Sequence, residues 1–271
     1  MLKRAVNSVL NQSYEPIEII IVDDGSRDGT REYIESIRNE NIKFLINEKN
    51  SGPCFSRNKA IFEASGKYIT GLDDDDEFGE DHIKYLVEAF DYRYSFVTSS
   101  MLQVTKKGSI ARNNNIGIHN LKSLLHYNKL TNQAFTLTER MRSVGGFDEQ
   151  FPAMQDYDTW LRLVDKFGPA LKIKSPTYIW HTDHESSRIS RSTSKREKAI
   201  DLFFERYIGR MNLDAHNSYQ ILRCHMLGGV LSFSDLVRRI NRQNWKMAIA
   251  LYSNSHGFLI KSLYDKMRLF F

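Results

Sequence analysis

The sequence has no long apolar run, only five prolines and only two cysteines, and each shortage excludes a class of protein. No window reaches ~18 uninterrupted apolar residues, so no transmembrane helix is expected. The first residues also lack the apolar core of a secretory signal peptide. Cys54 and Cys224 lie far apart and form no metal-ligand spacing, so we expect two reduced thiols in a cytoplasmic protein. The few prolines and the absence of low-complexity tracts argue against long disordered segments.

The charge is distributed unevenly along the 271 residues. Residues 186–271 hold 15 Lys/Arg and 6 Asp/Glu, so residues 1–185 carry a net charge of −4 within the total of +5. A basic end of this kind predicts an anionic partner, and a membrane surface or a phosphorylated lipid is the natural candidate. Residues 235–251 and 257–271 are amphipathic and basic, which is typical of an interfacial helix. A solvated surface of helices packed on their own core is the alternative.

Short β-branched runs alternate with helical patterns through the first half of the chain, which predicts an α/β fold with a largely parallel sheet. The run at 17–22 is almost continuously apolar, as in a strand buried on both faces. A loop with a short helix at 120–128 is expected within 105–135, and helices are expected from Asp156 and from about residue 197. Further strands are expected at 42–46, 68–72, 96–104 and 177–179, and further helices at 2–12, from Thr30 as N-cap, at 54–65 and at 80–91.

Five consecutive acidic residues, 73–77, follow the expected strand at 68–72. Their mutual repulsion is usually offset by a divalent cation, and a hard cation held by one or two carboxylates is typical of nucleotide chemistry. A calcium-binding EF-hand is excluded, because the loop has neither its sixth-position Gly nor its twelfth-position Glu. Asp23 and Asp24 end another strand, and ligands bind beyond the carboxyl ends of parallel strands. The sequence therefore predicts one acidic crevice; a solvated acidic loop is the alternative.

Five segments follow one another in a fixed order, at 19–30, 52–60, 66–76, 144–148 and 155–162. In their order and spacing they resemble the inverting glycosyltransferases of family 2, which are nucleotide-sugar enzymes with a GT-A fold. The resemblance covers about residues 1–190. It implies a Rossmann-like, mostly parallel sheet flanked by helices at 1–190, followed by a basic helical region at 191–271.

The resemblance implies a site for Mn²⁺ or Mg²⁺. The family holds the cation with an Asp-x-Asp motif after a strand, which here maps to Asp73-Asp74-Asp75. Asp75 is the expected direct ligand, Asp73 lies nearer the ribose and is a second ligand, and Asp74 assists. Asp76 is expected to cap the following turn. His184, or alternatively His181, is expected to approach the metal or the diphosphate, against the alternative of a histidine in a surface loop.

The resemblance also implies roles for three residues around the sugar donor. Asp24 would accept a hydrogen bond from the nucleotide base, unless it only forms a strand-end turn. Arg57 would meet the diphosphate, or equally form a salt bridge with the acidic cluster. Asp156 would be the general base that deprotonates the acceptor hydroxyl, with an N-cap as the alternative. Gln155 stands where the family usually has Glu, and Trp160 is expected in the core.

The family normally begins with a strand that precedes the helix at 2–12, whereas this chain starts at that helix. The strands at 17–22 and 68–72 would then lack a shared partner. One hypothesis is a metal-dependent inverting glycosyltransferase (EC 2.4) of cell-surface polysaccharide or glycolipid synthesis, acting on a glycan or lipid-linked acceptor. It would be cytoplasmic, with peripheral contact at the inner face of the membrane and no nucleic-acid partner. The alternative is a truncated, non-catalytic remnant or scaffold.

Overall fold

The computed structural model describes residues 1–37, 39–183 and 192–256, which divide into two compact units. The first unit takes most of the described residues up to 183. The second takes the described residues from 192 on, together with segments 122–128 and 151–154. The boundary at residue 190 stays a prediction.

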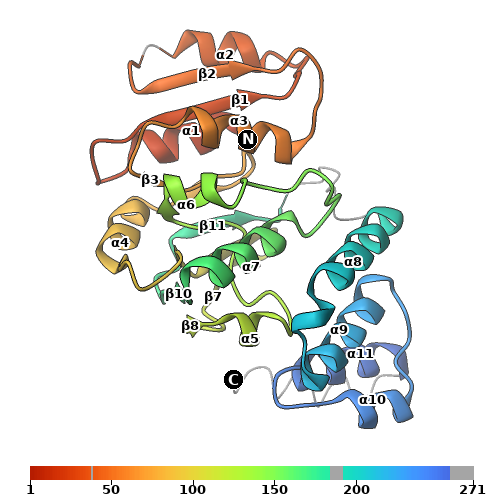
Figure 1. The fold of residues 1–271 in the computed structure, drawn as a ribbon. Helices are drawn as coiled ribbons and strands as arrows, with labels where there is room; N and C mark the ends of the chain where they lie inside the picture. Colours follow the sequence, from red (N-terminus) through yellow and green to blue (C-terminus); the bar gives the residue numbers. More distant parts are fainter. Residues whose placement is uncertain (38, 184–191, 257–271) are drawn as a thin grey trace. The chain divides into compact units, whose positions relative to one another are not determined.

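The first unit alternates strands with helices, as predicted, and Figure 1 shows its elements. Its helices are α1 (Leu2–Leu10), α2 (Thr30–Ser36), α3 (Pro53–Glu63), α4 (His82–Ala89), α6 (Thr138–Ser143) and α7 (Gln155–Phe167). Its strands are β1 (Ile19–Asp23), β2 (Ile42–Ile46), β3 (Tyr68–Ile69), β4 (Glu77–Phe78), β5 (Val97–Thr98), β6 (Met101–Thr105), β7 (Gly108–Arg112), β8 (Gly117–His119), β9 (Thr136–Leu137), β10 (Ala170–Lys172) and β11 (Tyr178–His181).

In the part of the chain that the structure describes, the strands form four small sheets, and their pairing is more mixed than the expected parallel sheet. Among the described residues, β1–β2, β5–β10 and β6–β11 pair in parallel, whereas β4–β11, β3–β9, β8–β10 and β6–β7 are antiparallel. The expected strand at 96–104 is in fact β5 and β6, which belong to different sheets. The expected loop after residue 105 begins with a hairpin, because Gly108 adopts a positive φ of 123° that reverses the chain into β7.

β1 lies beside β2 in register, with Ile19 opposite Ile42 and Asp23 opposite Ile46. Their β-branched residues favour this extended pairing, and α3 packs on β1 (Figure 1). The side chains of Ile19–Val22 are half-buried rather than fully buried as predicted. Within the described residues β1 pairs only with β2 and β3 only with β9, so β1 gains burial from fewer neighbours than a central strand would.

The first unit buries its apolar side chains in clusters between sheets and helices. One cluster joins Phe78 of β4, Ile83 of α4 and Tyr178 of β11. Trp160 of α7 is 1% exposed, which confirms its predicted place in the core, and its indole N–H donates to the Thr131 carbonyl at 3.0 Å. This bond satisfies the one polar atom that the indole buries. α2 is capped by Gly29 rather than by the predicted Thr30.

The second unit is helical. It comprises α8 (Thr193–Tyr207), the 3₁₀ turn η2 (Ile208–Arg210), α9 (Leu213–Met226), α10 (Phe233–Arg239) and α11 (Trp245–His256), with most of α5 (Leu121–Leu124). The segment 235–251, predicted to be helical, forms two helices. The Asn244 side chain donates to the Arg239 carbonyl and accepts from the Asn241 N–H, both at 2.9 Å, and these bonds stabilise the turn between α10 and α11. The predicted amphipathic segment at 257–271 lies outside the described residues. Within the described residues, no helix combines the length and apolar content that crossing a membrane would require.

The first unit buries an ionisable side chain that no predicted role explains. Lys172 of β10 is 3% exposed, and its Nζ donates to the Lys129 carbonyl at 3.3 Å. Burial lowers the pKa of Lys172 to about 8, because the charged amine loses water contacts. At pH 7 the Lys172 amine is still mainly charged, but it is less well solvated in the folded protein than in the unfolded chain. The lysine therefore lowers the free energy of unfolding at that pH.

We predict that Lys172→Met stabilises the protein by about 2 kcal/mol at pH 7, after allowance for the lost hydrogen bond. Because the folded pKa is below the unfolded one, the unaltered protein gains stability as pH rises from about 8 towards 10.5, so the advantage of the variant shrinks. Urea unfolding at neutral and at alkaline pH measures the free energy of unfolding of the variant and of the unaltered protein, and so gives the difference between them at each pH. Lys107→Met, at an exposed lysine of the same unit, is the matched control. A Lys172→Met protein that is less stable at both pH values would contradict this account.

Candidate active site

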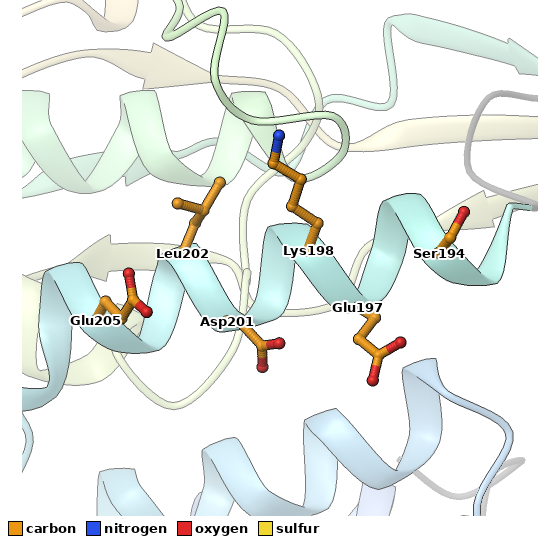
Figure 2. A pocket seen from close by; sticks show the side chains of 6 residues that line it. All are labelled: Ser194, Glu197, Lys198, Asp201, Leu202 and Glu205. Carbon is orange, nitrogen blue, oxygen red and sulfur yellow. The ribbon is translucent and has the colours of Figure 1, made fainter.

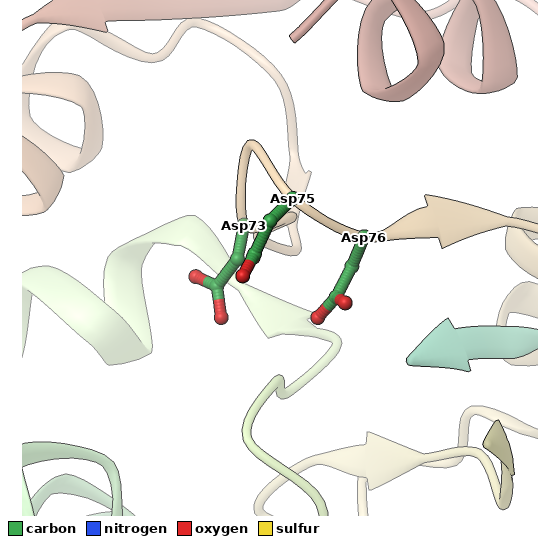
Figure 3. Close-up of side chains that lie close together, drawn as sticks. All are labelled: Asp73, Asp75 and Asp76. Carbon is green, nitrogen blue, oxygen red and sulfur yellow. The ribbon is translucent and has the colours of Figure 1, made fainter. Parts of the chain in front are cut away.

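Three carboxylates meet in the loop that joins β3 to β4. Oxygen atoms of Asp73, Asp75 and Asp76 all lie within 4.8 Å of one another, and Figure 3 shows the three side chains pointing to the same side of the loop. Asp74, which was predicted to assist, is exposed and is not a member of this group. Negative charges this close repel each other strongly where water is partly excluded. The geometry of this loop therefore depends on positive charge or hydrogen-bond donors around it.

Asp73 receives donors from two other parts of the fold. The Arg57 guanidinium of α3 binds its Oδ1 at 2.7 Å. The side-chain amides of Gln133 and Asn132 donate to Oδ1 at 3.3 Å and to Oδ2 at 2.9 Å. Gly71 permits this approach, because a Cβ there would collide with the Gln133 amide. The salt-bridge alternative for Arg57 is thus present in the structure.

Asp76 is held by β11 and does not cap the following turn as predicted. Its side chain is buried; Oδ2 accepts from the Tyr178 hydroxyl at 2.7 Å and Oδ1 from the His181 backbone N–H at 2.9 Å. Asp76 faces β11 because β4 starts one residue later and pairs with that strand. Burial raises the pKa of Asp76 to about 6, although both hydrogen bonds act to lower it.

One amide links the two ends of the acidic group. The Asn132 Nδ2 that donates to Asp73 also donates to the Tyr178 hydroxyl oxygen at 3.2 Å, and that hydroxyl in turn donates to Asp76. This chain of bonds fixes the carboxylates relative to one another. Neither Asn132 nor Gln133 was predicted, because they lie in a polar stretch without periodicity. Tyr178 was predicted only as part of a strand.

The donor set of this group suits a hard divalent cation. Mg²⁺ and Mn²⁺ prefer carboxylate oxygens, and Asp73, Asp75 and Asp76 offer three of them within the reach of one ion. Burial raises the pKa of Asp76, the charges of Asp75 and Asp73 raise it further, and a bound cation would act in the opposite direction. The side chains present therefore fit the implied metal, with Asp76 as a member that the sequence did not suggest.

Asp156 comes to the same neighbourhood from α7. The helix begins at Gln155, so Asp156 lies within its first turn and is not its N-cap. Burial raises the pKa of Asp156, while the Tyr157 N–H and the charge of Arg57 lower it in part. Arg57 feels the charges of both Asp73 and Asp156. The arginine thus interacts with carboxylates of both the acidic loop and α7.

Asp24 follows β1, and its side chain lies beside the N-terminus of α3, the helix that carries Arg57. Its carboxylate accepts from the Ser51 and Gly52 backbone N–H groups at 2.8 Å and from the Asn47 amide at 2.9 Å. Burial alone would raise the pKa of Asp24, but these bonds bring it below the ordinary value. A carboxylate at a helix N-terminus is electrostatically favoured. Its neighbour Asp23 instead pairs with Arg31 at 2.9 Å.

The two predicted histidines have different outcomes. His184 lies outside the described residues. His181 ends β11 with its Nε2 2.6 Å from Glu77 Oε1 and its Nδ1 3.5 Å from Asp183. Arg4 binds the same Glu77 oxygen at 3.1 Å. The fifth acidic residue of the run, Glu77, is therefore engaged by Arg4 and His181 and is not part of the three-carboxylate group.

A surface hollow in the second unit offers a competing location. It is lined by Ser194, Glu197, Lys198, Asp201, Leu202 and Glu205, all from α8 (Figure 2). None of these was predicted as a site residue, and Asp201 is engaged by Arg223 at 3.3 Å. Catalytic sites bring polar groups together from several elements. The acidic loop meets this condition with groups from α3, α7, β11 and segment 132–133, whereas the hollow does not.

Comparison with solved structures identifies the fold. The chain is similar to S. aureus TarS, with a TM-score of 0.66 and 16% identity over 97% of this chain and 48% of that one. It is also similar to the mannosyltransferase PcManGT from Pyrobaculum calidifontis, whose structure contains GDP-Man and Mn²⁺, with a TM-score of 0.56 and 14% identity over 99% and 76% of the two chains. The predicted GT-A fold is confirmed.

Sequence comparison gives the family. A putative colanic acid biosynthesis glycosyl transferase, WcaA of Escherichia coli (strain K12), is 29% identical over 98% of this chain and 92% of its own length. A Campylobacter jejuni enzyme named GalNAc(5)-diNAcBac-PP-undecaprenol beta-1,3-glucosyltransferase is 30% identical over 41% of this chain and 37% of its own length. The model of the family described as "Glycosyl transferase family 2" matches residues 1–147, which include Asp24, Arg57 and the acidic loop. The chain belongs to glycosyl transferase family 2.

Proposed function

We propose that this protein is a metal-dependent, inverting glycosyltransferase that moves a sugar from a nucleotide-diphosphate sugar to a hydroxyl of a glycan or lipid-linked acceptor. The observation that carries the proposal is the three-carboxylate group beside Arg57, with Asp156 in the same neighbourhood. Relatives named for colanic acid, teichuronic acid and chondroitin synthesis support a role in cell-surface polysaccharide formation. The relative whose name includes an undecaprenol-linked glycan supports a lipid-linked acceptor. Such an acceptor would bring this protein to the inner face of the membrane.

The donor would bind across the edge formed by Asp24, Arg57 and the acidic loop. Asp73, Asp75 and Asp76 would hold a divalent cation, which supplies positive charge to stabilise the departing nucleoside diphosphate. Asp73 would also be oriented towards the ribose by Asn132 and Gln133. Arg57 would shift between Asp73 and the diphosphate, since a guanidinium binds either anion with similar geometry.

Asp156 would act as the general base. An inverting transfer is a single displacement, in which the acceptor hydroxyl loses its proton while its oxygen attacks the sugar. A carboxylate with a raised pKa is a better base than an ordinary one, and burial raises the pKa of Asp156. Arg57, close enough to stabilise the charged form, keeps this carboxylate ready to accept the proton.

The experiment that tests the function is a screen of nucleotide sugars with Mn²⁺ or Mg²⁺, in which the released nucleoside diphosphate is measured. We expect one donor to be turned over only when the cation is present. The alternative is a non-catalytic remnant, which is favoured by the pairing of β1 with β2 alone among the described residues. Absence of both turnover and metal-dependent nucleotide binding would support the remnant.

We predict that Asp75→Ala lowers metal-dependent donor turnover at least about a hundredfold, because the cation loses a carboxylate of its small ligand set. Turnover with the preferred donor and calorimetric titration of Mn²⁺ measure the change. Asp74→Ala is the matched control, since Asp74 is adjacent, acidic, exposed and outside the three-carboxylate group. Equal turnover by Asp75→Ala and the unaltered chain would refute the metal assignment.

We predict that Asp156→Asn keeps donor binding but lowers transfer about 10²–10⁴-fold, because the amide cannot accept the proton. Calorimetry with the nucleoside diphosphate and a transfer assay separate the two effects, and the thermal midpoint controls for folding. A variant that loses donor binding would mean that Asp156 is not mainly the base of the acceptor.

We predict that Asn132→Ala weakens Mn²⁺ binding about 10–100-fold, because Asp73 loses the amide that orients it. The affinity for Mn²⁺ is the measure, since a purely structural role would change the thermal midpoint without changing this affinity in the folded protein. Asn114→Ala, at an exposed asparagine of the same unit, is the control. Unchanged Mn²⁺ affinity in Asn132→Ala would exclude the positioning role.

A further inference from the structure

α10 carries apolar side chains both towards the core and on its exposed surface. Leu236 packs against the core cluster of the second unit, which includes Ile221 and Leu251. Phe233 and Val237, four residues apart, are 66% and 61% exposed, although the Phe233 ring lies near the Tyr252 ring, with the centroids 6.2 Å apart. The exposed surface of a helix normally carries polar residues, so these two exposed apolar side chains are unusual.

Exposed apolar residues continue beyond the ends of the helix. Val230 precedes it and is 67% exposed, and Ile240 follows it and is 38% exposed. Phe233 and Val237 have the spacing i, i+4 and lie on one side of α10, whereas Val230 and Ile240 lie in the non-helical segments that flank it. We name these four residues the α10 stripe. Single exposed apolar residues are common, but four of them in one short segment mark an interaction surface.

The surroundings of the stripe are basic. Residues 229–256 contain four Lys/Arg and a single acidic residue, Asp235. The Asp235 carboxylate is engaged within its own helix, by the Ser232 hydroxyl at 2.7 Å and by Arg239 at 3.5 Å. Arg238, Arg242 and Lys246 are exposed. The segment therefore presents an apolar row flanked by positive charge.

Charge decides between the occupants of this surface. In a symmetric dimer the same patch meets itself, so two basic surfaces that each carry Arg238 and Arg242 would face each other and repel. An anionic lipid surface instead complements the positive charge and accepts the apolar side chains between its headgroups. Arg and Lys can keep their charged ends at the headgroups while their aliphatic stems lie along the apolar layer.

We propose that the α10 stripe docks this protein onto an anionic lipid surface, with Phe233 and Val237 entering the headgroup boundary and Arg238, Arg242 and Lys246 binding lipid phosphates. The inference rests on the proposed function only for the biological reason for such docking, since a lipid-linked acceptor would require contact with a membrane. The contact itself needs neither donor nor acceptor.

The test is sedimentation of the full chain with vesicles, in the absence of any nucleotide sugar. Vesicles of phosphatidylcholine alone are compared with vesicles that contain about 30% phosphatidylglycerol, at about 0.1 M and about 1 M salt. We expect binding to the anionic vesicles, weakened by salt. The variants Phe233→Ser/Val237→Ser and Arg238→Glu/Arg242→Glu are each expected to lower partitioning about tenfold or more.

Leu213→Ser is the matched control, because Leu213 of α9 is 75% exposed in the same unit but lies outside the stripe. It is expected to bind as the unaltered chain does, and the thermal midpoint shows that each variant is folded. Absence of a preference for anionic vesicles, or full binding by both double variants, would overturn the proposal. So would a lipid-free dimer in sedimentation velocity that the Phe233→Ser/Val237→Ser variant abolishes, which would assign the stripe to a second copy. None of these outcomes depends on whether the chain transfers a sugar.

Discussion

The first unit is organised around the repulsion among Asp73, Asp75 and Asp76. Three carboxylates within 4.8 Å of one another keep their arrangement only where other groups offset their charge. The fold supplies Arg57 from one side, the amides of 132–133 from another and the Tyr178 hydroxyl from β11. A divalent cation would complete this balance, and the same cation is what the departure of a nucleoside diphosphate requires.

The architecture explains why these groups meet. β3 ends just before the acidic loop and pairs with β9, and β4 begins directly after the loop and pairs with β11. Strand pairing therefore fixes both ends of the loop. α3 packs on β1 and brings Arg57 towards the loop while its N-terminus receives the Asp24 carboxylate. Donor-binding and acceptor-activating roles can then be served by residues that are distant in sequence, with Arg57 as their shared neighbour.

Part of this was predictable from sequence and part was not. The β-branched run of β1, the helix at α3 and the acidic residues at strand ends have local patterns, so their positions follow from periodicity and turn residues. The role of Asp76 could not be predicted, because it depends on pairing between β4 and β11, about a hundred residues apart. Asn132 and Gln133 lie in a segment without periodicity, and only tertiary contacts give them a role. The mixed pairing of the sheets was missed because two-residue strands such as β4 and β9 leave no pattern.

The central claim is that the acidic loop and the nucleotide share one cation. Binding of a nucleoside diphosphate, titrated by calorimetry with and without Mn²⁺, tests it most directly. A diphosphate that ligates the bound cation binds more tightly when the cation is present, and linkage makes the effect equal in both directions. The account predicts that Mn²⁺ raises the nucleotide affinity at least about tenfold and that the nucleotide raises the Mn²⁺ affinity equally. Equal nucleotide affinity with and without Mn²⁺ would contradict it.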